Sequence, residues 1–254
     1  MAVPRIAARG YQVAGDDYER ARPVYPAEAI NLLKRELPIR ERGTVLDLGA
    51  GTGKLTRQLI STRASLLAVE PVLAMAAHLR RAVPSARVVA ATAEAIPVAN
   101  RSVDAVVAGT AFHWFRGERA LAEIARVLQA GGGLGLVWNN PETEVDWVAQ
   151  VWGLVAEYRG DAPSNRTLRW QDAFEQTSSF TPLQHRRFSH AQQVGVDDVA
   201  ARVASISWIA VLAEAERAEV LRRVRAAVTA HPDLAGRDRF PLPYRTDVYW
   251  CWRG

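Results

Sequence analysis

Short apolar runs alternate with helix-like segments between residues 43 and 140, and this alternation restricts the fold more than any other feature of the chain. Continuous runs of Val, Leu and Ala are typical of strands buried on both faces, and helices between such strands indicate a parallel sheet. The expected strands cover residues 44–50, 65–70, 86–91, 102–109 and 133–139. The helices expected between them cover residues 54–60, a stretch that ends near residue 83, and residues 120–133, where glycines close the last one. The pattern predicts an α/β fold with a doubly wound parallel sheet.

The rest of the chain favours two further strands and several helical insertions. Residues 182–191 and 245–253 are the expected strands, which brings the sheet to seven strands with an antiparallel pair at its end. Residues 196–230 favour two helices, and residues 1–35 favour a leading loop and helix. We therefore expect one domain over residues 1–254, with a core of about 36–139, 182–191 and 239–254 and a helical lid of 1–30, 140–182 and 192–238.

Composition limits the cellular compartments and the kinds of partner that the protein is expected to have. No apolar run reaches the roughly 18 residues of a membrane helix, and the N-terminus lacks the apolar stretch of a secretory signal. Cys251 is the single cysteine, which excludes a disulfide within the chain and a Cys-based zinc site. We expect a cytoplasmic protein with no membrane partner and no metal. The net charge is +5, but the arginines are scattered among acidic residues, so no basic patch indicates nucleic acid.

A glycine-rich turn follows the first expected strand and precedes the first expected helix. Asp47 ends the strand, and glycines stand at positions 49, 51 and 53. Glycines in such a turn let the backbone approach a ligand closely. The pattern fails as a dinucleotide fingerprint, because Lys54 stands where its third glycine belongs. It also fails as a phosphate-binding P-loop, because Leu48 and Leu55 replace the first glycine and the final Ser/Thr.

A second acid follows at the end of the next expected strand. Glu70 comes 19 residues after Gly51, a position from which a carboxylate accepts hydrogen bonds from both hydroxyls of a ribose. Folds that bind NAD and folds that bind S-adenosylmethionine (SAM) share this feature. It therefore indicates a nucleoside without deciding between the two.

The turn resembles motif I of the class I SAM-dependent methyltransferases, in which an acid precedes three alternating glycines. Residues 91–97 are similar to the segment after the third strand of these enzymes. Residues 123–128, with the glycines that follow them, are similar to the helix and turn before the fifth strand. His113, Trp114 and Phe115 match the HWF segment of the type 11 subgroup, which includes enzymes like trans-aconitate methyltransferase. The resemblance implies a Rossmann-like fold and SAM as cofactor, with S-adenosylhomocysteine (SAH) as product.

The resemblance also implies which residues contact the cofactor. Asp47 would take part in binding its ammonium group, Glu70 the ribose, and Thr92 and Ala93 the adenine edge. Met75 would lie beside the adenine; the alternative is that it only fills the core. The full set of expected cofactor contacts is Tyr18, Arg22, Asp47, Gly49, Ala50, Gly51, Gly53, Glu70, Pro71, Met75, Thr92, Ala93, Glu94, Gly109, Thr110 and His113.

His113 is the candidate catalytic residue, because it follows the fourth strand at the edge of the sheet where ligands bind. It would act as a base or orient the acceptor; the alternative is that it only holds its loop. The expected acceptor is a small molecule methylated on a carboxylate or hydroxyl oxygen, as in the resembling subgroup. The alternatives are an N-methyltransferase, a SAM-binding regulatory protein without transferase activity, an NAD-dependent dehydrogenase and transfer to RNA.

Overall fold

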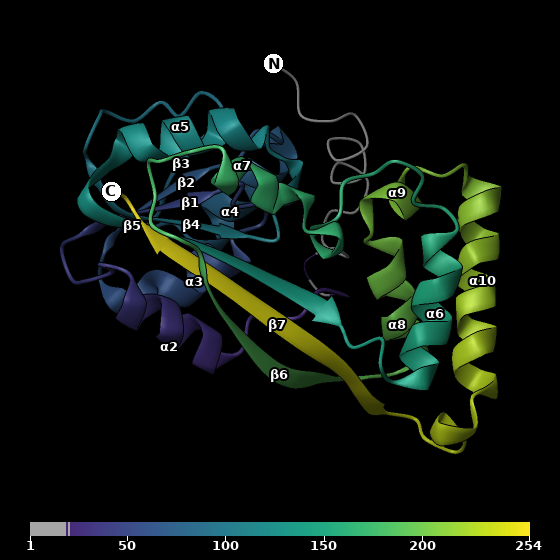
Figure 1. The fold of residues 1–254 in the computed structure, drawn as a ribbon. Helices are drawn as coiled ribbons and strands as arrows, with labels where there is room; N and C mark the ends of the chain where they lie inside the picture. Colours follow the sequence, from purple (N-terminus) through teal and green to yellow (C-terminus); the bar gives the residue numbers. More distant parts are fainter. Residues whose placement is uncertain (1–18, 20) are drawn as a thin grey trace.

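A seven-stranded sheet forms the centre of the molecule in the computed structural model, which describes Glu19 and residues 21–254 (Figure 1). Its strand order is β3-β2-β1-β4-β5-β7-β6, and β7 is the one strand of this sheet that runs opposite to the other six. The strands are β1 (Thr44–Leu48), β2 (Ser65–Val69), β3 (Arg87–Val89), β4 (Val103–Gly109), β5 (Leu128–Pro141), β6 (Gln184–Val194) and β7 (Phe240–Trp252). The predicted doubly wound α/β fold with a mostly parallel sheet is confirmed.

Helices cover both faces of the sheet because the inner strands are apolar on both sides. One face packs against α2 (Ala27–Glu36) and α3 (Lys54–Leu59), and α4 (Leu73–Ala82) lies against Ala68 on the same face. The other face packs against α5 (Gly117–Val127) and α7 (Asp172–Glu175). Each face has its own apolar core, so the strands between them are held on both sides.

Four helices form a separate bundle beside the sheet: α6 (Asp146–Ala156), α8 (Val196–Ala204), α9 (Ser207–Ala210) and α10 (Glu214–Ala230) (Figure 1). The start of β7 joins this bundle to the sheet, because Phe240, Leu242 and Tyr244 belong to the bundle's apolar core. Single 3-10 turns complete the described chain: η1 (Ile60–Thr62), η2 (Phe112–Trp114), η3 (Asn165–Thr167), η4 (Arg169–Gln171) and η5 (Pro232–Leu234). None of the helices in the described part of the chain is long and apolar enough to cross a membrane.

Two expected helices differ from the structure. The helix expected over 120–133 ends at Val127, because Leu128 already pairs with Val103 as the first residue of β5. The glycines after it therefore lie within an irregular part of that strand rather than closing a helix. The segment 196–230 forms three helices instead of two. Its first break comes at Ser205, whose hydroxyl donates to the backbone carbonyl of Arg202 and ends α8.

Candidate functional site

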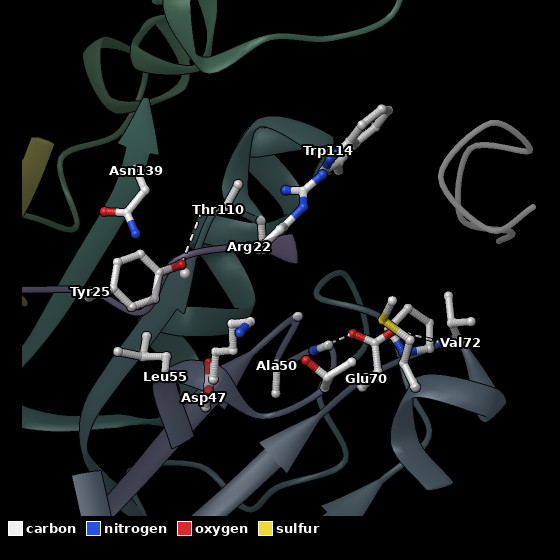
Figure 2. Close-up of a pocket in the computed structure, with 18 of the residues that line it drawn as sticks. Arg22, Tyr25, Asp47, Ala50, Leu55, Glu70, Val72, Thr110, Trp114 and Asn139 are labelled. Carbon is white, nitrogen blue, oxygen red and sulfur yellow. Dashed lines mark hydrogen bonds between the residues drawn. The ribbon is translucent and has the colours of Figure 1, made fainter. Parts of the chain in front are cut away.

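A cleft opens at the carboxyl ends of β1, β2 and β4, where the strand order reverses (Figure 2). Open α/β sheets bind ligands at this reversal, because the loops on its two sides diverge. We call it the strand-end cleft. It is lined by Arg22, Pro23, Tyr25, Asp47, Gly49, Ala50, Gly51, Thr52, Lys54, Leu55, Glu70, Pro71, Val72, Met75, Gly109, Thr110, Ala111, Trp114, Phe115, Asn139 and Arg202.

The glycine turn after β1 forms the floor of this cleft. Gly49 has a φ of +69°, and a Cβ atom there would stand 2.7 Å from the Cβ of Ala111. Gly53 has a φ of +88° and precedes α3, where a Cβ atom would stand 2.9 Å from the Cγ of Leu79. Side chains are therefore excluded at both positions by contacts with neighbouring elements. Gly53 shapes the turn but is not among the residues that line the cleft.

Asp47 is buried beneath the turn with one carboxylate oxygen unsatisfied. Its Oδ2 accepts a hydrogen bond of 2.5 Å from the Thr56 hydroxyl, whereas its Oδ1 has no hydrogen-bond partner among the described residues. Burial raises the pKa of Asp47 to about 7, although the Thr56 hydrogen bond opposes the shift. A buried oxygen without a donor is costly, so this atom fits a ligand that brings a cation or an N–H group.

Glu70 ends β2 with a carboxylate that the backbone fixes in place. Its Oε2 accepts from the amide of Gly51 at 2.9 Å, and its Oε1 accepts from the amide of Val72 at 2.8 Å. Burial raises its pKa, and the two amides oppose that shift. Each oxygen keeps a further lone pair for a ligand hydroxyl. The apolar residues Pro71, Val72 and Met75 continue the wall beside it.

The segment that precedes α2 covers the opposite side of the cleft. Tyr25 Oη lies 3.0 Å from the Thr110 hydroxyl, and Figure 2 shows the two side chains meeting above Leu55. Gly109 leaves room for this contact, because a Cβ atom there would stand 2.6 Å from Tyr25 Oη. Arg22 donates from Nη2 to the carbonyl of Ser205 at 2.9 Å and lines the cleft between the sheet and the bundle.

Three expected cofactor contacts in the loop after β3 do not line the cleft. Ala93 is buried in the apolar core, and Glu94 accepts a hydrogen bond of 2.9 Å from the amide of Arg116. Thr92 lies in the same loop after β3, with its carbonyl accepting from the amide of Ala95. Their contact with a cofactor therefore stays a prediction. Tyr18 lies outside the described residues.

His113 lies in η2, behind the cleft rather than on its wall. Its Nδ1 accepts a hydrogen bond of 3.1 Å from the indole N–H of Trp138, so Nδ1 carries no proton and Nε2 carries one. Burial, together with the charge of Arg22, lowers the pKa of His113 to about 3. The ring is therefore neutral at pH 7 and has no nitrogen free to accept a proton. This arrangement favours a role for His113 in orienting the acceptor or holding its loop over a role as a base.

A second cavity adjoins the strand-end cleft and shares Arg22, Thr110, Trp114, Asn139 and Arg202 with it. We call it the arginine chamber. It is lined by Arg22, Thr110, His113, Trp114, Asn139, Asn140, Pro141, Trp152, Val155, Ala156, Arg159, Pro163, Ser164, Asn165, Arg166, Arg202, Ile206, Ser207 and Trp208. Most of these residues come from the helical bundle and its loops, so the chamber lies between sheet and bundle.

Sequence reasoning missed several residues that line both cavities. Asn139 stands at the carboxyl end of β5, and this position is the signal that would have indicated it. Its side chain is held by the Thr246 hydroxyl, which donates to Oδ1 at 2.6 Å, and it donates from Nδ2 to the carbonyl of Val24 at 3.0 Å. Arg202 lies on α8, a helix whose sequence carries no sign that it reaches the cleft.

Comparison with known proteins identifies the family. Residues 46–136 match the family described as Methyltransferase domain. An uncharacterized methyltransferase of Mycobacterium tuberculosis (strain ATCC 25618 / H37Rv) is 39% identical over 229 residues, which cover 90% of this chain and 89% of the relative. The chain belongs to the class I SAM-dependent methyltransferases. An uncharacterized methyltransferase-like protein of Schizosaccharomyces pombe (strain 972 / ATCC 24843) is 35% identical over 234 residues, 92% of this methyltransferase and 91% of the relative.

Other similarities cover less of the chain or show the fold alone. A malonyl-[acyl-carrier protein] O-methyltransferase of Methylococcus capsulatus (strain ATCC 33009 / NCIMB 11132 / Bath) is 41% identical over 96 residues, 35% of each chain. A structure from Anaeromyxobacter dehalogenans, provisionally a type II methyltransferase, has a TM-score of 0.64 at 25% identity and covers 91% of this chain and 97% of its own. The phosphoethanolamine N-methyltransferase 2 of Haemonchus contortus has a TM-score of 0.53 at 13% identity, over 89% of this methyltransferase and 52% of its own chain.

Family membership decides between the two cofactors that Glu70 left open: SAM is the cofactor and SAH the product. The strand-end cleft fits SAM on three observations of its own. Asp47 Oδ1 is a buried acceptor without a donor, which suits an ammonium group. The floor at Gly49 admits no side chain, and the Glu70 carboxylate is held rigidly where a ribose would lie.

Proposed function

We propose that this methyltransferase transfers a methyl group to an oxygen of a small organic molecule bound in the arginine chamber. The observation that carries the proposal is the absence of a base from that chamber. None of its described lining residues is Asp, Glu, Lys, Cys or Tyr, and His113 is neutral with its proton on Nε2. A hydroxyl or a protonated amine must lose a proton on methylation, whereas a carboxylate oxygen needs no base. The chamber therefore favours a carboxylate as acceptor.

The residues of the strand-end cleft divide the binding of SAM among them. Asp47 and Arg22 hold the charged groups of the amino-acid end, and Gly49, Ala50, Gly51 and Gly109 form the surface against which it lies. Glu70 accepts from the ribose hydroxyls, and Pro71 and Met75 pack beside the adenine. We keep the adenine-edge role of Thr92 and Ala93 and the cofactor contacts of Glu94 and Tyr18 as parts of the same proposal.

Transfer takes place where the two cavities meet, at Thr110, Trp114 and Asn139. SAM supplies a methyl group already activated by its positive sulfur, so the protein positions the acceptor and excludes water. The bundle, with the leading segment, acts as the lid over this junction, in line with the proposed division of the single domain into core and lid. His113 supports the junction from behind through Trp138. We also propose, on the HWF segment, that the enzyme belongs to the type 11 subgroup.

The test is to incubate the enzyme with methyl-labelled SAM and a small-metabolite extract, then treat the labelled product with mild alkali. Alkali releases the label of a carboxyl methyl ester as methanol, and this is the expected result. Label that resists alkali indicates an ether or an N-methyl product and contradicts the carboxylate acceptor. Binding of SAM without any labelled product would favour the regulatory alternative. Glu70→Ala, which should lose SAM affinity, is the negative control.

A further inference from the structure

The arginine chamber has a strong excess of positive charge, and two of its arginines stand away from the strand-end cleft. Arg22 and Arg202 line both the strand-end cleft and the arginine chamber. Arg159 and Arg166 line the chamber and not the cleft. None of the described residues on its wall is an aspartate or a glutamate. A cavity with charge of one sign attracts ligands of the opposite sign. The chamber therefore selects against a cationic acceptor.

Arg159 is the clearest element of this excess. It follows the last turn of α6, is half-buried, and its side chain makes no hydrogen bond or ion pair with any described residue. Asp161, two residues on, is exposed; it lines a neighbouring cavity that Arg159 also borders, and it forms no ion pair with Arg159. A partly desolvated guanidinium without a counter-charge is unfavourable, and an anion that forms two parallel hydrogen bonds with it removes that cost.

Arg166 also lines the chamber, in a loop that is held in place. Its Nη2 donates to the carbonyl of Pro141 at 2.6 Å, and the adjacent Asn165 donates from Nδ2 to Asn140 Oδ1 at 2.9 Å. These bonds fix the loop against the end of β5. Arg166 is therefore a guanidinium that is held in place in the chamber wall, and such preorganisation favours the binding of an anion.

The bundle also contributes apolar residues to the chamber wall. Trp152 and Val155 come from α6, and Ile206 and Trp208 come from the segment around α9. Trp208 is fixed by a hydrogen bond from its indole N–H to the carbonyl of Val155. An acceptor that fills this space has an apolar or aromatic body of metabolite size.

We propose, on the basis of the proposed function, that the acceptor carries a second anionic group that is not methylated and that Arg159, supported by Arg166, binds it. The accepting carboxylate oxygen lies at Thr110 and Asn139 and contributes the electron pair of the new C–O bond. The pair of the broken C–S bond stays on sulfur, and no proton moves. The accepting carboxylate becomes a neutral ester, so the product keeps the charge of the second group alone.

The first test follows the charge of acceptor and product. The metabolite extract is separated on anion and cation exchangers at pH 8, and each fraction is incubated with the enzyme and methyl-labelled SAM. We expect the acceptor in the anion-retained fraction, and we expect the anion exchanger to retain the labelled product as well. An acceptor in any other fraction, or a labelled product that is no longer retained, overturns the inference. If no fraction is labelled, the proposed function itself fails, and the binding test below still decides the anion site.

The second test measures binding directly on the full chain saturated with SAH. The probes are phenylacetate, phenyl phosphate, phenylacetamide and phenethylamine, which share an aromatic ring and differ in charge. NMR titration should show the anions binding about tenfold more tightly than the amide, the size expected of a charge-assisted hydrogen bond, with the amine weakest. Comparison of phenylacetate with phenyl phosphate shows whether a carboxylate or a phosphate is preferred. Equal binding of anions and amide, or binding of none of the probes, overturns the proposal.

A pair of variants makes the second test specific to Arg159. Arg159→Gln should remove the roughly tenfold preference for the anions and leave SAH affinity unchanged, because Arg159 does not line the strand-end cleft. Arg222→Gln is the matched control, because Arg222 is an exposed arginine on α10 that pairs with Glu219. It should keep the preference. An Arg159→Gln protein that binds SAH normally and still prefers the anions would rule the site out.

Discussion

Asp47 and His113 lie in buried surroundings that shift their pKa values in opposite directions. Burial disfavours the charged form of each, so the pKa of Asp47 rises to about 7 and that of His113 falls to about 3. Before a ligand binds, His113 is therefore neutral near pH 7, and Asp47 is neutral below that pH and about half ionised at it. Asp47 gains a charge when a cation arrives, whereas nothing in the surroundings of His113 favours its charged form.

The affinity for SAM should rise with pH between about 5.5 and 7.5. The ammonium group of SAM needs an ionised carboxylate, and Asp47 ionises as the pH passes through its pKa of about 7. Calorimetry in buffers of different ionisation enthalpy should also detect a proton released on binding below pH 7. Asp47→Asn should bind SAM more weakly and without this pH dependence. A wild-type affinity that is constant over the range would contradict the role of Asp47.

The free energy of unfolding of the SAM-free protein should fall as the pH rises, the opposite of the trend in SAM affinity. The pKa of Asp47 is higher in the folded protein than in the unfolded chain, so the folded state holds a proton that the unfolded state releases. Its stabilising contribution is complete below about pH 4 and is lost as the pH rises through 7, by as much as ~4 kcal/mol. Urea unfolding should show that the free energy of unfolding falls more between pH 5 and pH 8 in the wild type than in Asp47→Asn. Equal decreases in the two proteins would contradict the raised pKa of Asp47.

Substitutions of His113 should separate catalysis from stability. His113→Asn keeps an acceptor for the Trp138 indole, whereas His113→Ala leaves that N–H buried and unpaired at a cost of about 1–3 kcal/mol in unfolding free energy. Turnover at saturating SAM should fall by less than about tenfold in His113→Asn, because removing a general base costs roughly 100-fold or more. Thermal unfolding and initial rates provide the two readouts. A several-hundredfold loss of turnover in both variants, with an unchanged fold, would show that His113 acts as a base.

At the scale of elements, the described residues just before α2 are attached to the core through a few specific contacts. The backbone of Tyr25 is bracketed by Gln58 on α3, which accepts from its amide at 3.1 Å and donates to its carbonyl at 2.7 Å. Tyr25 in turn reaches Thr110 at the end of β4. Gln58 does not line the strand-end cleft itself. It therefore acts on the cleft only through the position of the segment.

Gln58→Ala should weaken SAM binding by about three- to tenfold, the effect of losing one or two ordinary hydrogen bonds. The cause is a less firmly placed Tyr25 and Arg22, with every residue of the cleft floor unchanged. Fluorescence titration with SAH measures the effect, and Gln150→Ala on the exposed surface of α6 is the control. An affinity that does not differ from the control would show that the segment is held by other contacts.

At the scale of the whole molecule, β7 connects the sheet to the bundle, so we expect the two to unfold as one cooperative unit. Its first half packs in the bundle through Phe240, Leu242 and Tyr244, and its second half packs in the sheet cores through Val248 and Cys251. It is bonded to β5 and β6 along most of its length. The bundle therefore loses its attachment only when the edge of the sheet opens.

Val224→Ala tests this coupling from the bundle side. Val224 is fully buried in the bundle core, so the change should cost about 1–3 kcal/mol of unfolding free energy. Urea unfolding followed by tryptophan fluorescence and by circular dichroism should give one coincident transition, shifted to lower urea. SAH, which binds at the sheet, should shift it back. Two separate transitions, with the bundle unfolding first, would contradict the single unit.

The sequence alone determined the parallel part of the sheet and the floor of the cleft. Both are encoded locally: apolar runs predict buried strands, and the Asp47 turn with Glu70 comes at strand ends that parallel pairing brings together. Local signals also misled, as at Leu128, because pairing with Val103 outweighed the helical pattern.

Tertiary structure decided what no local pattern contains. Arg159 and Arg202 reach the cavities only because the bundle folds back against the sheet, and the sequence separation between them and the glycine turn leaves no periodic trace. The neutral state of His113 likewise depends on burial by other elements and on the charge of Arg22, and the hydrogen bond from Trp138 fixes its tautomer. Proton affinity and cavity charge arise from burial among distant residues, so they follow from the packing and not from the order of the residues.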